Sequence, residues 1–158
     1  MRKTTIILGL VFLLLCTLAA CFVVGGTLQA RISIMDAGAS EHPEAFESIR
    51  RVLAAGAAPQ VFDGRVPDGP EGLRLQDVTI TLTNRGLLDA EWLNVEVAGV
   101  PGDIAVYSLS GEGSSVWGRS TGTMNLKLIS EGKALGRRTY RIEYYVLGLK
   151  RHITVTED

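Results

Sequence analysis

The longest uninterrupted apolar run of this 158-residue chain lies near its N-terminus. Residues 6–24 read IILGLVFLLLCTLAACFVV, and thirteen of these nineteen residues are Leu, Ile, Val or Phe. Nineteen helical residues extend about 28 Å, which matches a bilayer hydrocarbon core of about 30 Å. The run therefore predicts a transmembrane helix, and the glycines at positions 25 and 26 predict its end.

The charges on either side of this run predict its orientation. Arg2 and Lys3 precede it, whereas Arg31 on the far side is soon followed by Asp36 and Glu41. Because cytoplasmic flanks carry the excess of Lys and Arg, we expect a cytoplasmic N-terminus and an extracytoplasmic C-terminal part. Residues 1–26 are thus expected to form the signal-anchor of a single-pass cell-membrane protein.

The same segment has a second interpretation as a secretory signal. Residues 6–17 have the length of an apolar h-region, and small residues follow them. The next four residues are Leu18-Ala19-Ala20-Cys21. They resemble the lipobox of bacterial lipoproteins, and this resemblance implies cleavage before Cys21 and its lipidation. Residues 22–24 prolong the apolar run instead of starting a polar tether, which favours the intact span, but both interpretations stay open.

A short linker or first strand and one helix are expected next. Within residues 27–42, Ile32 and Ile34 alternate with polar or small residues. Residues 43–56 read PEAFESIRRVLAAG and predict an amphipathic helix that ends near Gly56. The apolar positions of this helix are Phe46, Ile49, Val52 and Leu53. So narrow an apolar stripe is typical of a helix that packs on its own domain.

From Gln60 onward the apolar positions recur every second residue, with turn residues between the runs. Val78, Ile80 and Leu82 alternate with threonines, and an Asn-Arg-Gly turn follows. Further candidate strands are Leu93 to Val97, Ile104 to Leu109, Thr123 to Ile129, Thr139 to Val146 and Arg151 to Thr156. Such closely spaced short strands predict an antiparallel β-sandwich over residues 57–158, so the fold class is mainly β.

Residues 77–99, DVTITLTNRGLLDAEWLNVEVAG, resemble the opening strands of immunoglobulin-like modules on bacterial surfaces. In those modules an alternating strand ends in an Asn-x-Gly turn, and the next strand begins with a small residue, here near Ala90. The resemblance implies an immunoglobulin-like β-sandwich with a role in interaction or scaffolding. A fold does not by itself assign a function.

Composition disfavours several kinds of chemistry. The formal net charge is -1 and no basic run exceeds two residues, which disfavours a nucleic-acid partner. The two cysteines, Cys16 and Cys21, both lie in the N-terminal apolar run, so the remaining domain has no disulfide framework. His42 and His152 are the only histidines, too few for a typical zinc site.

No motif for catalysis or cofactor binding is present. Residues 111–122 are rich in glycine but contain neither a Gly-x-Ser-x-Gly elbow nor the Lys-Ser/Thr ending of a phosphate-binding loop. Asp63, Asp68 and Glu71 lie in one acidic loop, but their spacing does not fit a calcium loop, which favours solvated side chains. We therefore expect no enzyme activity, no metal and no cofactor.

Two tryptophans are the remaining candidates for a binding surface. Trp92 and Trp117 would suit an aromatic platform for a sugar or a peptide, but covering an edge of the core is the favoured interpretation. The leading functional hypothesis is a non-enzymatic, membrane-anchored extracytoplasmic module that binds or supports a protein or cell-wall component of the envelope. The alternative is an accessory subunit of an envelope transporter, secretion machine or enzyme complex, with the N-terminal helix packed in the bilayer.

Overall fold

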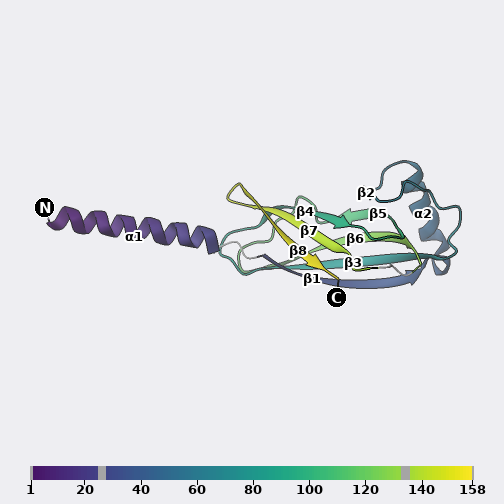
Figure 1. Cartoon of the computed structure of the whole chain (residues 1–158), viewed down its shortest axis with the longest axis horizontal. Coiled ribbons are helices and arrows are strands. Elements are labelled where there is room, and N and C mark those ends of the chain that lie inside the picture. The colour runs from purple at the N-terminus through teal and green to yellow at the C-terminus, as the bar shows by residue number, and fades with distance from the viewer. Residues whose placement is uncertain (1, 25–27, 133–135, 158) are drawn as a thin grey trace.

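A long N-terminal helix leads into two antiparallel sheets that face each other (Figure 1). The computed structural model describes residues 2–24, 28–132 and 136–157, with side chains of the first helix given for residues 5–19. The elements are α1 (Arg2–Val24), β1 (Leu28–Gly38), η1 (Ala39–Glu41), α2 (Pro43–Ala54), β2 (Gln60–Val61), β3 (Leu73–Asn84), β4 (Glu91–Ala98), β5 (Asp103–Ser110), β6 (Thr121–Glu131), β7 (Thr139–Val146) and β8 (Leu149–Thr156). The mainly β fold class and the β-sandwich predicted from the alternating pattern are confirmed.

The larger sheet has the strand order β1-β3-β6-β5-β2, and the smaller has the order β4-β7-β8. β1 pairs with β3 along its whole length, from Leu28 opposite Asn84 to Gly38 opposite Arg74. The segment expected to be a linker or first strand is therefore a full strand. The sandwich includes residues 28–38 in addition to the expected residues 57–158.

The main core lies between the two sheets. Val78, Ile80 and Leu82 of β3 have no exposed surface, as their alternation with threonine predicts. Tyr140 and Ile142 of β7 are equally buried and belong to the same cluster. Successive strand residues point to opposite faces, so one set of alternating positions from each sheet fills this space.

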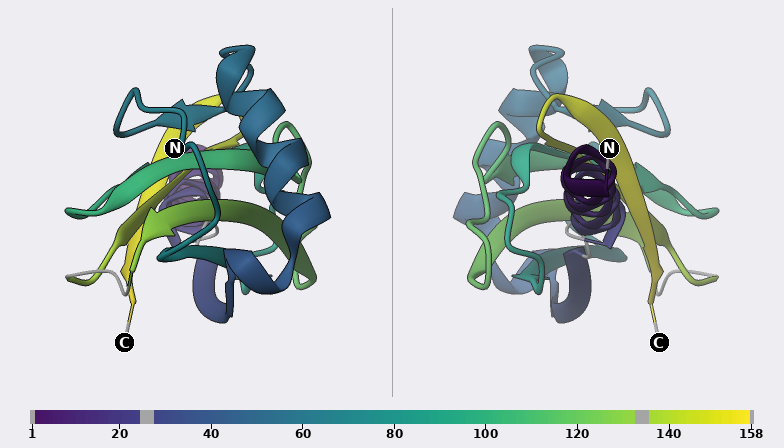
Figure 2. Two further views of the ribbon diagram at one scale, coloured as in Figure 1. Left: turned by 90° about the vertical axis from the view of Figure 1, so that its right-hand side faces the viewer. Right: turned by 90° about the vertical axis from the view of Figure 1, so that its left-hand side faces the viewer.

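A second, smaller core lies under α2, at the end of the sandwich farthest from α1 (Figures 1 and 2). Phe46 and Ile49 of α2 are buried beside Leu75 of β3 and Ile129 of β6. These two strand residues alternate with those of the main core, so α2 covers the outer face of the five-stranded sheet. The predicted helix is confirmed, and Gly56 follows its end with a left-handed φ of 64°.

α1 projects from the end of the sandwich where β1 begins (Figure 1). The predicted helix is therefore present, but the predicted transmembrane span is not confirmed. Among the residues that the structure describes, no helix is both long and apolar enough to cross a membrane. Such a crossing needs about 20 predominantly apolar residues.

Candidate functional site

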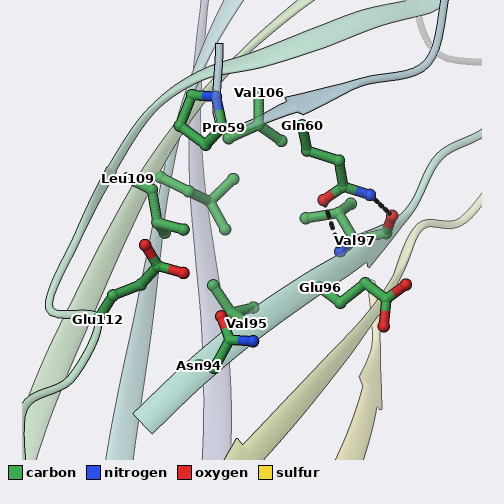
Figure 3. A pocket seen from close by; sticks show the side chains of 10 residues that line it. Pro59, Gln60, Asn94, Val95, Glu96, Val97, Val106, Leu109 and Glu112 are labelled. Carbon is green, nitrogen blue, oxygen red and sulfur yellow. Dashed lines mark hydrogen bonds between the residues drawn. The ribbon is translucent and has the colours of Figure 1, made fainter. Parts of the chain in front are cut away.

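A groove runs along the side of the sandwich between β4 of the small sheet and β5 and β2 of the large sheet (Figure 3). Its volume is about 430 Å³, which falls within the usual range of ligand sites. The lining residues are Pro59, Gln60, Asn94, Val95, Glu96, Val97, Val106, Leu109, Glu112 and Leu126. They come from both sheets, so the groove lies where the two layers are open to solvent along this side.

The backbone of Val95 faces this groove. β4 is an edge strand, with β7 on one side and no strand beside it on the other within the described chain. On the outer side, the N–H and carbonyl of Leu93 are bonded to Ser114 and Gly113. The N–H and carbonyl of Val97 are bonded on that same side to the Gln60 side chain. Because hydrogen-bonding direction alternates along a strand, the N–H and carbonyl of Val95 point outward between these two positions.

Gln60 closes one end of this open edge. Its Oε1 accepts a hydrogen bond of 3.1 Å from the Val97 N–H, and its Nε2 donates one of 2.5 Å to the Val97 carbonyl (Figure 3). β2 holds the residue in place, since Gln60 pairs with Val106 of β5. The side-chain amide thus substitutes for one residue of a neighbouring strand. The occupied positions Leu93 and Val97 are about 13 Å apart along β4, and the outward-facing backbone groups of Val95 lie between them.

The groove has an apolar floor and an acidic rim. Val106 and Leu126 of the large sheet are buried in the floor, and Leu109 is half-buried beside them. Glu96 and Glu112 are exposed and line the groove without any lysine or arginine. A ligand that fits this groove would therefore have an extended backbone that hydrogen-bonds to Val95. It would have an apolar side chain that packs on the floor, and a neutral or positive charge beside the acidic rim.

The structure brings the two tryptophans to the same end of the sandwich, where β4 begins. Ala90 and Val116 form a backbone bridge, which places Trp92 and Trp117 on two adjoining segments. Their side chains are 68% and 71% exposed. The favoured interpretation, that each covers an edge of the core, is therefore wrong. Their use as an aromatic platform for a sugar or peptide stays a prediction.

Other residues singled out in the sequence do not converge. His42 precedes α2 and His152 lies on β8, and both are exposed. In the acidic loop, Asp63 pairs with Arg65. Within the described ranges, no group of three or more His, Cys, Asp or Glu side chains is placed to hold a metal ion. The side chain of Cys21 and both predicted helix-ending glycines lie outside what the structure describes.

A buried ionic network at the end near α2 was not anticipated. Arg138 is 1% exposed and donates two hydrogen bonds to Asp103, from Nε at 2.8 Å and from Nη2 at 2.6 Å. Arg138 also donates a hydrogen bond to Glu157. The same Glu157 carboxylate accepts a hydrogen bond from the Tyr140 hydroxyl. Burial lowers the pKa of Arg138, but hydrogen bonding and charge from Asp103 outweigh it and raise the pKa overall. The network joins β5 to β7 and therefore links the two sheets.

Comparisons with known proteins identify similar folds only. No protein-family model matches the chain, and no curated protein matches it. The GAE domain of yeast GGA1 is 14% identical, with 57% of this chain and 93% of that chain covered and a TM-score of 0.42. The Northeast Structural Genomics Consortium target SoR45 is 11% identical, with 83% and 82% covered and a TM-score of 0.43.

A FixG-related protein from Vibrio parahaemolyticus is 14% identical, with 80% of this chain and 93% of that chain covered and a TM-score of 0.34. At these identities and TM-scores, the similarities say nothing about ligand or activity.

Proposed function

We propose that this chain is a non-enzymatic binding module of the cell envelope that receives an extended segment of a partner polypeptide beside β4. The observation that supports this most directly is the outward-facing backbone of Val95 between two occupied positions of the same edge. An added peptide strand gains affinity from backbone hydrogen bonds and selectivity from pockets for alternate side chains. The apolar floor formed by Val106 and Leu126 supplies such a pocket.

The exposed carboxylates of Glu96 and Glu112 favour a basic residue in the partner segment. Rim charges of this kind act mainly on selectivity and association rate. The resemblance to immunoglobulin-like surface modules agrees with a binding role but does not identify the partner.

The proposal is tested by selecting short random peptides on the full chain and measuring their affinity by calorimetry. A Val95→Pro variant lacks the outward-facing N–H, which an edge strand tolerates, but it also replaces a core side chain and should lose some stability. We expect the selected peptides to alternate apolar and polar residues and to lose binding to Val95→Pro. Peptides that bind this variant as tightly as the unmodified chain would refute the proposal.

A neighbouring substitution controls for damage to the fold. The N–H of Glu96 points the other way, toward Arg141 of β7, so Glu96→Pro should disrupt the pairing of β4 and lower stability. Circular dichroism should show Val95→Pro to be folded. Gln60→Ala frees the backbone of Val97 and should strengthen peptide binding, since the open edge then includes a second outward-facing residue.

We further propose that α1 attaches this module to a membrane, with the N-terminus cytoplasmic and the sandwich on the outer side. The described side chains of α1 include Ile6, Phe12 and Leu13, which are 61%, 69% and 65% exposed. Exposed apolar side chains on a helix are stabilised by transfer out of water, and a bilayer provides that environment. Arg2 and Lys3 ahead of the apolar residues support the orientation.

Flotation of the full chain with phosphatidylcholine vesicles tests this attachment, and recovery in the soluble fraction would refute it. Leu13→Lys places a charge in the middle of the apolar segment, at a cost of about 2.5 to 3.5 kcal/mol, and should reduce flotation. Intact mass distinguishes an uncleaved segment from a chain that has lost residues 1–20 and carries acyl chains on Cys21.

A further inference from the structure

One end of the sandwich carries a group of exposed apolar side chains, and it is the end where β1 begins. Leu28 of β1 lies opposite Asn84, so the β3–β4 loop, the β5–β6 loop and the β7–β8 turn all belong to this end. Five large apolar residues there are more than half exposed: Leu87, Trp92, Trp117, Leu147 and Leu149. We call these five residues the proximal patch.

The proximal patch is more than the scattered exposure of a normal surface. Outside α1, nine large hydrophobic residues of the described chain are exposed, and five of them form this patch. The remaining four, on β1 and around β2, are Ile34, Met35, Val61 and Val66. The patch also contains both tryptophans of the sequence. A concentration of this kind marks a surface that contacts another apolar phase or molecule.

The backbone holds the patch in place. The Ala90–Val116 bridge joins the start of β4, which carries Trp92, to the β5–β6 loop, which carries Trp117, and the Gly118 N–H donates a 2.8 Å hydrogen bond to Asp89. Three described non-glycine residues have a positive φ: Trp92 at 53°, Arg119 at 58° and Leu147 at 50°. All three lie at this end. A left-handed conformation costs about 1 to 2 kcal/mol per non-glycine residue, and such strain is concentrated at functional surfaces.

The position of α1 indicates what covers the patch. Val24 and Leu28 are separated by four Cα–Cα steps of 3.8 Å, so the end of α1 lies within about 15 Å of the start of β1. Figure 2 (right) looks onto this end, with α1 projecting toward the viewer and loops of the sandwich around it. If α1 is in a bilayer, the patch is at the level of the lipid headgroups, where tryptophan is enriched.

The charged residues near the proximal patch do not favour one kind of lipid headgroup. The charged residues within three positions of the patch in sequence are Arg85, Arg119, Lys150 and Arg151 with Asp89 and Glu91, and Glu143 is ion-paired with Lys150, so no strongly basic face forms there. The expected contact is therefore mainly apolar, and zwitterionic lipid should be sufficient for it. A strongly basic face would instead have required anionic lipid.

We propose that the proximal patch docks onto the lipid headgroup layer beside α1, so that the sandwich rests on the membrane surface instead of moving freely on a tether. This inference rests on the proposed membrane attachment of α1. Docking leaves the groove beside β4, which runs along the side of the sandwich, open to a partner.

Intrinsic fluorescence tests the docking directly, because Trp92 and Trp117 are the only tryptophans in the chain. The full chain is reconstituted in phosphatidylcholine vesicles, and quenching by brominated phosphatidylcholine is compared with quenching by aqueous iodide. We expect blue-shifted emission, strong quenching by the brominated lipid and weak quenching by iodide. Trp92→Phe and Trp117→Phe should each retain lipid quenching of the remaining tryptophan.

Leu147→Ser with Leu149→Ser should reduce lipid quenching without loss of flotation. Met35→Ser is the matched control, since Met35 is 75% exposed but lies on β1, and it should leave the quenching unchanged. If the chain floats with the vesicles while iodide quenches both tryptophans, docking is refuted. The patch would then be expected to bind a protein partner. A chain that does not float would refute the membrane attachment as well.

Discussion

At the scale of single residues, Arg138 is the clearest case of a group that depends on its partners. Its guanidinium is almost fully buried and is bonded to Asp103 and Glu157. A buried ion pair adds little over an apolar pair of the same shape, but breaking one leaves an unpaired buried charge. We therefore expect this network to matter most when only one member is removed.

Arg138→Met should lower the free energy of unfolding by about 3 to 5 kcal/mol, because it leaves the Asp103 carboxylate buried without its counter-charge. Urea-induced unfolding at neutral pH measures this loss. Arg137→Met is the matched control, since Arg137 is exposed and its replacement should have little effect. Adding Asp103→Asn to Arg138→Met should recover part of the loss. If Arg138→Met were as stable as Arg137→Met, the network would not be needed for the stability of the fold.

The buried tyrosines make the free energy of unfolding depend on pH in the alkaline range. Burial, followed by the charge of Asp77, raises the pKa of Tyr107 to about 12. Burial also raises the pKa of Tyr140 and of Tyr144. In the unfolded chain these phenols ionise near pH 10, so the unfolded state binds fewer protons above that pH. Their contribution to stability is complete below about pH 10 and is lost as the pH rises toward about 12.

Urea-induced unfolding measured at several alkaline pH values checks this dependence, with the free energy of unfolding expected to fall above about pH 10. Tyr107→Phe should make the fall less steep, because one phenol no longer titrates. An unchanged slope in this variant would contradict the assigned shift.

The burial of Arg138 was within reach of the sequence pattern, although a basic pair suggests a surface. Tyr140, Ile142 and Tyr144 share the inward face of β7. Extending that alternation backward by one step places Arg138 on the same face and Arg137 on the other. The identity of its partners could not be predicted, because Asp103 and Glu157 are 35 and 19 residues away in the chain.

At the scale of elements, the loops of the end near α1 are held together by close backbone contact. Gly118 lies against the backbone of Leu87, and a Cβ at position 118 would collide with the Leu87 carbonyl. Gly118→Ala should therefore separate the two loops and lower stability by about 1 to 3 kcal/mol. Thermal unfolding measures the loss, and the tryptophan emission of the chain should shift with it.

Gly64→Ala is a suitable comparison, since no atom lies within 4 Å of a Cβ at that position and its φ is not left-handed. Its stability should remain within about 0.5 kcal/mol of the unmodified chain. If Gly118→Ala were equally stable, the contact with Leu87 would not be what fixes these loops.

The strands and α2 could be predicted because each has a local periodic signal. The role of β1 could not be settled in the same way. Its alternation over Ile32 and Ile34 is short, and its status as a strand comes from pairing with β3, whose paired residues lie between 36 and 56 positions away. Non-local pairing of this kind leaves no distinct mark in the strand itself.

At the scale of the whole molecule, the candidate site depends on which strands are the edges of the two sheets. The sequence predicts β4 with the correct alternation, and Val95 is buried as expected. Its outward-facing backbone is a consequence of the order β4-β7-β8, which the pattern along the chain does not contain. At the end near α1, the start of β4 and the β5–β6 loop likewise expose the two tryptophans, which the sequence predicted to cover an edge of the core.

Amide hydrogen exchange at Val95, with and without a selected peptide, tests whether a partner strand pairs with the outer side of β4. Without peptide, we expect the Val95 amide to exchange faster than that of Glu96, which faces β7. The peptide should slow exchange at Val95 and leave Glu96 nearly unchanged, because only the outer side of β4 gains a partner. Peptide binding that leaves the Val95 amide unprotected would show that the peptide does not pair with the outer side of β4.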